Sequence, residues 1–169
     1  HILGLHYDGS HYGADFNSAK FMVQVVINRK TKNITFISLR QYSCAMKFID
    51  KPKIFFEIVS KVNSIEANKI ANHHKYKFDN NDIPIMKKGI IAKANFCPEF
   101  KNALINAYKK QINDYSASCY FWTCNDGFNK YTNKVIKGQN HYGKLLMEVS
   151  EELYKENDIV MEEFTKFDN

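Results

Sequence analysis

The chain has 169 residues, of which 44% are hydrophobic and 14% aromatic, so it can form one hydrophobic core and is too apolar for an intrinsically disordered protein. No stretch approaches the roughly 18 consecutive apolar residues of a membrane span, and the first residues do not resemble a signal peptide, so we expect a cytoplasmic protein without a membrane anchor. The net charge of +6 favours an anionic partner, and the four cysteines lack the C-x-x-C spacing of a zinc site, which argues against a bound metal.

Residues 21–37 are predicted to form a β-hairpin. The segment "FMVQVVI" at 21–27 is rich in β-branched residues, and "ITFI" at 34–37 is a second short strand of the same character. The polar segment "NRKTKN" at 28–33 is typical of the turn between them.

A helix is predicted to follow the hairpin, with Ser38 as its cap. Its apolar positions recur at spacings of three and four residues and are Leu39, Tyr42, Met46 and Ile49. A second stripe consists of Arg40, Ser43 and Lys47. Because the two stripes lie on different faces, packing of the apolar stripe into the core would turn the second stripe toward a boundary or a cleft.

Short helices are predicted for the middle of the chain. Their starts are marked by residues that favour a cap or a first helical turn, namely Pro52, Ser64, Asn81 or Asp82, and Pro98. The apolar face of the first of these helices is expected to be Phe55, Ile58, Val59 and Val62. That of the helix from Pro98 is expected to be Phe100, Leu104, Ile105 and Tyr108.

The segment "ASCYFWTCNDG" at 117–127 is too aromatic and too short for a helix, and we expect a strand or extended segment that leads into a loop at 128–138. A last helix is predicted from "QNHYGKLLMEVSEELY" at 139–154. Gly143 in its first turn indicates a close approach of backbone or ligand. The acidic tail that follows is expected to be a solvated helix end.

The order of these elements and four local patterns resemble the NADAR family, also called YbiA-like, whose members act on N-glycosides and ADP-ribose-related groups. The patterns are "YGADFNSAKF" (12–21), "SLRQYSCAMKF" (38–48), "SIEANKIA" (64–71) with "IMKKGIIAKANFCPEFKNALINA" (85–107), and "YFWTCND" (120–126) with "GQNHYGKLLMEV" (138–149). The resemblance covers residues 12–153. It implies a single, mainly helical α+β domain over residues 1–169, with a small β-hairpin or sheet and a cleft between the Lys47 helix, the Trp122 segment and the Asn140 turn.

Lys47 is the catalytic residue that this resemblance implies. Cleavage of an N-glycosidic bond develops positive charge on the anomeric carbon of the ribose, and a neutral lysine amine can attack that carbon and open the sugar as a Schiff base. Arg40 on the same stripe would disfavour the protonated amine and so lower its pKa. The alternative is a boundary lysine that extends its ammonium group into water.

The sequence departs from the family pattern at Arg40, where relatives have a glutamate that would act as acid and base or stabilise the developing charge. Asp15 and Asp126 are the candidates by motif to replace that carboxylate, and we include both among the predicted catalytic residues. If neither replaces it, hydrolysis is lost and a ligand-holding site remains, in which Arg40 would bind a pyrophosphate through paired hydrogen bonds.

The resemblance implies further ligand-binding residues. Trp122, the single tryptophan, would stack on a base or a ribose, with an ordinary core aromatic as the alternative. Asn140 would donate to a phosphate at a helix N-terminus, with a helix cap as the alternative. The other ligand-binding candidates are Phe16, Gln41, Tyr42, Ser43, Asn125 and Gly143.

The resemblance therefore predicts an N-glycosidase-type hydrolase that acts on an ADP-ribosyl or ribosyl-phosphate N-glycoside through Lys47, without a cofactor. The alternative is a catalytically impaired module that binds ADP-ribose or a related nucleotide as a sponge or sensor. A small RNA-binding domain is the third class. Residues 1–147 carry 22 basic and 10 acidic side chains, but only two of the basic ones are arginines, which favours phosphate in a small ligand over a nucleic-acid groove. The resemblance implies that this ligand is a small nucleotide or ADP-ribosyl group, free or attached to nucleic acid.

Overall fold

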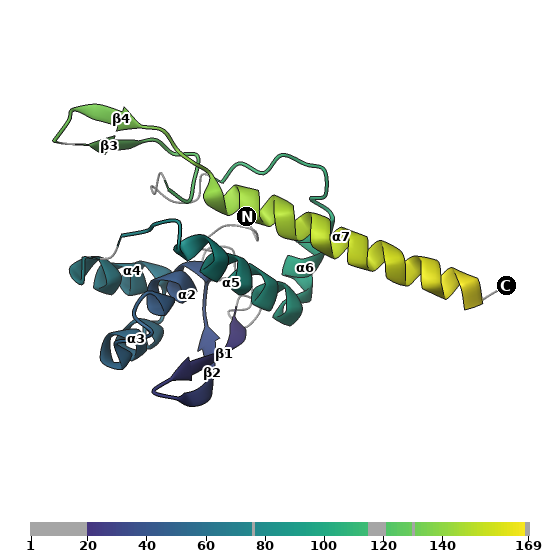
Figure 1. Ribbon diagram of the computed structural model, residues 1–169, viewed down its shortest axis with the longest axis horizontal. Helices are drawn as coiled ribbons and strands as arrows, with labels where there is room; N and C mark the ends of the chain where they lie inside the picture. The colour runs from purple at the N-terminus through teal and green to yellow at the C-terminus, as the bar shows by residue number, and fades with distance from the viewer. Residues whose placement is uncertain (1–19, 76, 115–120, 130, 168–169) are drawn as a thin grey trace.

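The computed structural model describes residues 20–75, 77–114, 121–129 and 131–167, and the side chains of these residues as far as Asp158. Its elements, labelled as in Figure 1, are β1 (Phe21–Ile27), β2 (Lys30–Phe36), α2 (Leu39–Met46), α3 (Pro52–Val59), α4 (Ser64–His73), α5 (Asp82–Phe96), α6 (Pro98–Ile105), β3 (Gly127–Asn129), β4 (Lys134–Ile136) and α7 (His141–Phe167). The fold is α+β and mainly helical, as the sequence predicted.

The hairpin β1–β2 is confirmed, but its turn is shorter than expected. The strands pair antiparallel from Phe21 opposite Phe36 to Ile27 opposite Lys30. Only Asn28 and Arg29 lie between them, and both adopt positive φ angles, 51° and 60°, which is the backbone of a tight hairpin turn that matches the strand twist. Residues 30–33 therefore belong to the second strand and not to the turn.

Helix α2 is the central element of the fold. Ser38 caps it by accepting a hydrogen bond from the backbone N–H of Gln41 at 3.1 Å, as predicted. Residues 39–45 are all buried, because α3, α4, α5 and β2 pack around the helix. The prediction that the second stripe lies at a boundary is wrong for Arg40 and Ser43, which are buried, whereas Lys47 at the end of the helix remains partly exposed.

The predicted helix starts at Pro52, Asp82 and Pro98 are confirmed. Helix α4 is capped one residue earlier than expected, by the Asn63 side chain, which accepts from the backbone N–H of Glu66 at 2.9 Å. The assignment of Val62 to a buried helix face is wrong, because α3 ends at Val59 and Val62 is exposed beyond it.

The C-terminal third contains one element that the sequence did not predict. Strands β3 and β4 pair antiparallel within the segment that was expected to be a loop, and they project from one end of the molecule in Figure 1. Residues 121–125 form turns and not a strand, while residues 117–120 lie outside the described part of the chain.

Helix α7 packs against α5 and α6 and then extends beyond them toward the C-terminus (Figure 1). Lys87 of α5 donates to Glu148 and Glu152 of α7, each at 2.7 Å. The Ser150 hydroxyl donates to the Leu104 carbonyl of α6 at 2.6 Å. These bonds fasten the first half of α7 to the helical body. Within the described ranges, none of the helices combines the length and the apolar character that crossing a membrane would need.

Candidate functional site

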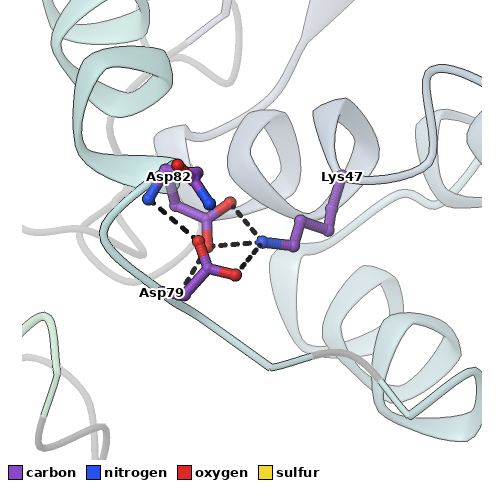
Figure 2. Close-up of polar contacts among 4 residues, drawn as sticks. Lys47, Asp79 and Asp82 are labelled. Carbon is purple, nitrogen blue, oxygen red and sulfur yellow. Dashed lines mark hydrogen bonds and ion pairs between the residues drawn. The ribbon is translucent and has the colours of Figure 1, made fainter.

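The amine of Lys47 is bound by two carboxylates, as Figure 2 shows. Its Nζ lies 3.0 Å from Oδ1 and 2.9 Å from Oδ2 of Asp82, and 3.1 Å from Oδ2 of Asp79. Asp82 is the first residue of α5 and its side chain is 3% exposed, whereas Asp79 in the α4–α5 connection is 54% exposed and Lys47 is 26% exposed. The lysine therefore bridges one buried and one exposed carboxylate.

The backbone around the start of α5 holds both carboxylates in place. Oδ2 of Asp82 accepts from the backbone N–H of Asp79 at 2.7 Å, and Oδ1 of Asp79 accepts from the backbone N–H of Asn81 at 2.9 Å. Short-range bonds of this kind are typical of aspartates in turns, and an acidic residue in the first turn also complements the helix dipole. The sequence "DNND" at 79–82 thus positions two acids before any ligand is present.

These contacts overturn the expectation that the Lys47 amine is neutral. Desolvation by itself would lower the pKa of Lys47, but hydrogen bonds to Asp82 and Asp79, together with their Coulombic attraction, raise that pKa above the ordinary lysine value. The hydrogen bond from Lys47 in turn lowers the pKa of Asp79. In this state Lys47 is an ammonium ion, because two anions outweigh partial burial and any repulsion from Arg40.

Arg40 lies on the same helix but has a different set of partners. Its Nε donates to Oδ1 of Asn68 on α4 at 3.1 Å, and its Nη2 donates to the same oxygen. The guanidinium carbon lies 4.4 Å above the centre of the Phe78 ring. Its Nη1 is buried and has no hydrogen-bond partner among the described residues. No described carboxylate forms an ion pair with this arginine.

The α4–α5 connection runs along the Arg40–Lys47 stripe. Phe78 contacts Arg40, and the next residue, Asp79, contacts Lys47. Arg40 and Lys47 are seven residues apart, which is two helical turns or about 10 Å of rise. The stripe is therefore covered by this connection, and Lys47 is the member that keeps partial access to solvent.

Trp122 is buried beside the same connection. Its ring meets Phe78 edge-to-face at 5.3 Å and Phe121 at 4.9 Å, and Phe78 stacks on Phe121 at 6.1 Å. Full burial of the indole is the arrangement of a core aromatic, the alternative that the sequence left open. Its Nε1 has no hydrogen-bond partner in the part of the chain that the structure describes. Stacking on a ligand remains a prediction that this geometry does not support.

Asn140 ties the start of α7 to the segment 112–114. Its Oδ1 accepts from the backbone N–H of Asp114 at 3.1 Å, and its Nδ2 donates to the Ile112 carbonyl at 2.8 Å. A Cβ atom at Gly143 would overlap with the Asn140 side chain and the Ile112 carbonyl, so close approach of protein atoms explains this glycine. The Asn140 amide thus bonds to the 112–114 backbone, and its role toward a phosphate stays a prediction.

The first backbone donors of α7 also have protein partners. The N–H of His141 donates to the Phe121 carbonyl at 3.4 Å, and that of Tyr142 donates to the Trp122 carbonyl at 2.9 Å. The position where the sequence placed a phosphate at a helix N-terminus is thus taken by the 121–122 backbone.

Comparison with protein families identifies the domain. A family model of the NADAR domain matches residues 7–154. The chain belongs to the NADAR family. A search of curated proteins finds no match.

Three of the ligand-binding residues predicted from the NADAR pattern have structural roles here. The Gln41 amide donates to the carbonyls of Ile58, Val59 and Lys61, each at 3.1 Å, and its oxygen accepts from the N–H of Ile37 at 2.9 Å. Tyr42 is buried in the core, and burial raises its pKa to about 12. The Ser43 hydroxyl donates to the Arg40 carbonyl at 3.0 Å.

Of the two carboxylates proposed from the NADAR motif, Asp126 has partners other than Lys47. Asp126 accepts from Lys137 at 2.7 Å and from the Gly138 N–H at 3.0 Å, and the Lys137 bond lowers the pKa of Asp126. Asp15 and Phe16 lie outside the described residues. The backbone N–H of Asn125 donates to the Thr123 hydroxyl at 3.2 Å. The site roles of these four residues stay predictions.

Sequence reasoning missed Asp79 and Asp82 as partners of Lys47. Both flank a helix start that was predicted correctly, and an i, i+3 pair of aspartates at a helix start was the available signal. Their proximity to Lys47 could not be read from that signal, because the contacts span 32 and 35 residues of sequence.

Proposed function

We propose that this NADAR protein is an N-glycosidase that hydrolyses the bond between a ribosyl carbon and a nitrogen base, with Lys47 as nucleophile and Asp82 as its proton acceptor. The contact between Lys47 Nζ and the Asp82 carboxylate, at 2.9 and 3.0 Å, carries this proposal. The family glutamate is replaced by Arg40, and Asp82 with Asp79 would supply the lost negative charge from α5 and its preceding connection. The substrate class is an ADP-ribosyl or ribosyl-phosphate N-glycoside.

The first step is proton transfer from the Lys47 ammonium to Asp82. In the free protein the two carboxylates favour the ammonium form, so substrate must change that balance. A ligand that covers the cluster would exclude water and so disfavour the two charged groups, which favours a neutral pair of amine and carboxylic acid. The amine would then be able to attack the anomeric carbon.

The remaining steps balance with one water molecule. As the amine bonds to the anomeric carbon, the carbon–nitrogen bond to the base breaks, and the base leaves with the proton held by the carboxylic acid. Opening of the sugar ring moves one amine proton to the ring oxygen and leaves a protonated Schiff base on Lys47. Water adds to the imine carbon while Asp79, the exposed carboxylate, accepts its proton. Asp79 then passes its proton to the nitrogen of the adduct, and collapse releases the free sugar and restores the Lys47 ammonium and the Asp79 carboxylate.

Borohydride trapping tests this proposal. The full-length protein is incubated with ADP-ribose, whose open form carries an aldehyde, then reduced and digested for mass spectrometry. We expect a reduced adduct at Lys47, and none at that position in Lys47→Met. Lys87 is a matched control lysine, because it is 27% exposed and also pairs with two carboxylates. Equal labelling of Lys47 and Lys87 would contradict the proposal.

Turnover is measured with a ribosyl-phosphate N-glycoside of an uncharged base such as AMP, whose base leaves with the proton that the mechanism supplies. We expect loss of base release in Lys47→Met and in Asp82→Asn, and wild-type release in Lys87→Met. The isosteric Asp82→Asn substitution keeps an acceptor for the Asp79 N–H but cannot take the lysine proton.

A non-catalytic binder of the same ligand is the second candidate function. One observation favours it, since the raised pKa of Lys47 describes an ammonium that does not attack carbon. Binding of ADP-ribose without an adduct at Lys47 and without base release would replace the first proposal by this one.

A further inference from the structure

Arg40 is a buried cation without a counter-ion among the described residues. Its side chain is 5% exposed, and Nε and Nη2 both donate to a neutral amide oxygen, that of Asn68. Two partly buried lysines differ from it, because Lys47 and Lys87 each have two carboxylate partners. A buried charge is stable in a protein when it is paired and hydrogen-bonded, so an unpaired guanidinium indicates an anion that is supplied from outside the described chain.

A second buried donor without a described partner belongs to another side chain that contacts Phe78. The Nε1 of Trp122 is fully buried and has no partner among the described residues, as is true of Nη1 of Arg40. Phe78 contacts both side chains, at 4.4 Å from the guanidinium carbon and 5.3 Å from the indole centre. Two side chains that contact one phenyl ring therefore each carry a buried donor, and no described acceptor serves either donor.

Building on the proposed function, we propose that Arg40 and Trp122 form an anion subsite for the phosphate end of the substrate. Phosphate presents several acceptor oxygens and a negative charge, which suits one guanidinium and one neutral N–H. Arg40 lies about 10 Å along α2 from Lys47, on the same face of the helix. A ribosyl phosphate can thus extend along α2 with its anomeric carbon at Lys47 and its phosphate at Arg40.

Because both donors are buried, a ligand can reach them only if the α4–α5 connection moves. Phe78 lies on Arg40 and Asp79 binds Lys47, so a ligand that enters along this face displaces the α4–α5 connection at both residues. Withdrawal of Asp79 from Lys47 also removes one of the two carboxylates that hold the amine as an ammonium ion. Phosphate binding at one end of the stripe would in this way assist deprotonation of the lysine at the other end.

Tryptophan fluorescence measures binding at this subsite, because Trp122 is the single tryptophan and contributes all of the tryptophan emission. Full-length protein is titrated with inorganic pyrophosphate, ribose 5-phosphate and ribose, in parallel with isothermal titration calorimetry. We expect the two phosphorylated compounds to bind and to change the Trp122 emission, and ribose to do neither at the same concentrations.

The variants are chosen to separate the charge from the fold. Arg40→Met keeps the length of the side chain and removes the charge, and we expect pyrophosphate binding to weaken about 10- to 100-fold, the effect of losing a charge-assisted hydrogen bond. Arg29→Met is the matched control, since Arg29 is the other arginine and is exposed in the β1–β2 turn. It should bind as wild type. Trp122→Phe keeps an aromatic ring without the donor and should also weaken binding.

Several outcomes would overturn the subsite. They are absence of pyrophosphate binding by the wild type, unchanged binding in Arg40→Met or Trp122→Phe, and calorimetric binding without a change in Trp122 emission. If Arg40→Met does not fold, the wild-type titrations and Trp122→Phe still decide the question. An adduct at Lys47 that forms equally well with ribose and ribose 5-phosphate refutes the subsite and leaves the N-glycosidase intact. Pyrophosphate binding without any Lys47 adduct refutes the N-glycosidase and leaves the subsite.

Discussion

The side chain of Asn140 occupies the space that a Cβ atom at Gly143 would need. The Ile112 carbonyl borders the same space, and it accepts a hydrogen bond from the Asn140 amide at 2.8 Å. Asn140 itself adopts a positive φ of 51°. The glycine and the asparagine therefore form one packing unit, which sets the position of the first turn of α7 against the segment 112–114.

Gly143→Ala is expected to destabilise the protein by about 1–3 kcal/mol, the usual cost of overpacking a well-packed site. Asn140→Gly, which preserves the positive φ, should cost about 2 kcal/mol through loss of its bonds to Asp114 and Ile112. The double variant should cost less than the sum, because the new methyl group then gains space. Urea denaturation of the four proteins measures this coupling. Strictly additive costs would show that the two residues do not share the space.

Gln41→Leu is expected to lower the free energy of unfolding by about 2–4 kcal/mol, since three carbonyls at the end of α3 and one N–H lose their buried partner. Gln111→Leu is the control, because Gln111 is exposed and surface substitutions usually change stability by less than about 0.5 kcal/mol. The measurement is again urea denaturation. A destabilised Gln41→Leu protein that binds ADP-ribose as wild type would establish a structural role and exclude the ligand contact.

Asp82→Asn and Asp79→Asn should differ in stability, because one carboxylate is buried and the other is exposed. The Asp82 substitution is expected to cost about 1–2 kcal/mol, below the value for a fully buried pair since Lys47 is partly solvated. The Asp79 substitution should cost less. Similar losses from the two substitutions would contradict the burial difference between them.

The lowered pKa of Asp79 also predicts how the free energy of unfolding changes at acid pH. Its folded-state pKa is lowered, chiefly by the hydrogen bond from Lys47, so its contribution is present above the ordinary aspartate pKa of about 3.9. That contribution is lost as the pH falls through the lowered value. Stability of the wild type and Asp79→Asn, measured from pH 2 to pH 6, should therefore converge at the acid end. A constant difference over this range would argue against the shift.

The reactivity of the Lys47 amine provides a further test. Because two carboxylates raise its pKa, the neutral fraction at about pH 8 is smaller than for an ordinary lysine with a pKa near 10.4. Competitive acylation followed by mass spectrometry should show slow labelling of Lys47, which becomes faster in Asp82→Asn as the pKa falls. Labelling of Lys87 should not respond to that substitution. Unchanged Lys47 labelling in Asp82→Asn would mean that this carboxylate does not stabilise the ammonium form.

For Asp82→Asn we expect faster acylation of Lys47 but no base release, and these opposite changes distinguish catalysis from simple amine reactivity. If Asp82 serves as proton acceptor, the variant has a more reactive amine toward an acylating reagent and yet no base release from the N-glycoside. If the lysine acts without Asp82, both activities should rise together. This divergence separates a proton-transfer role from an electrostatic one.

The elements that the sequence predicted correctly depend on short-range signals. Ser38 caps α2, Pro52 and Pro98 open their helices, and Gly143 marks a close approach, because each of these effects acts within a few residues of its own position. The errors were also local in kind. Residues 30–33 of β2 were placed in a turn and the β3–β4 hairpin in a loop, since a polar strand that faces solvent resembles a loop in composition.

What surrounds Lys47 and Arg40 was decided by tertiary structure. The stripe of Arg40, Ser43 and Lys47 was predicted from its spacing, but its partners Asn68, Phe78, Asp79 and Asp82 come from α4, α5 and the connection between them. Periodicity tells which side chains share a helix face and not which element packs against that face. The protonation of Lys47 depends on that packing, because the Coulomb energy of an ion pair changes with separation and burial, and both are set by residues more than 30 positions away.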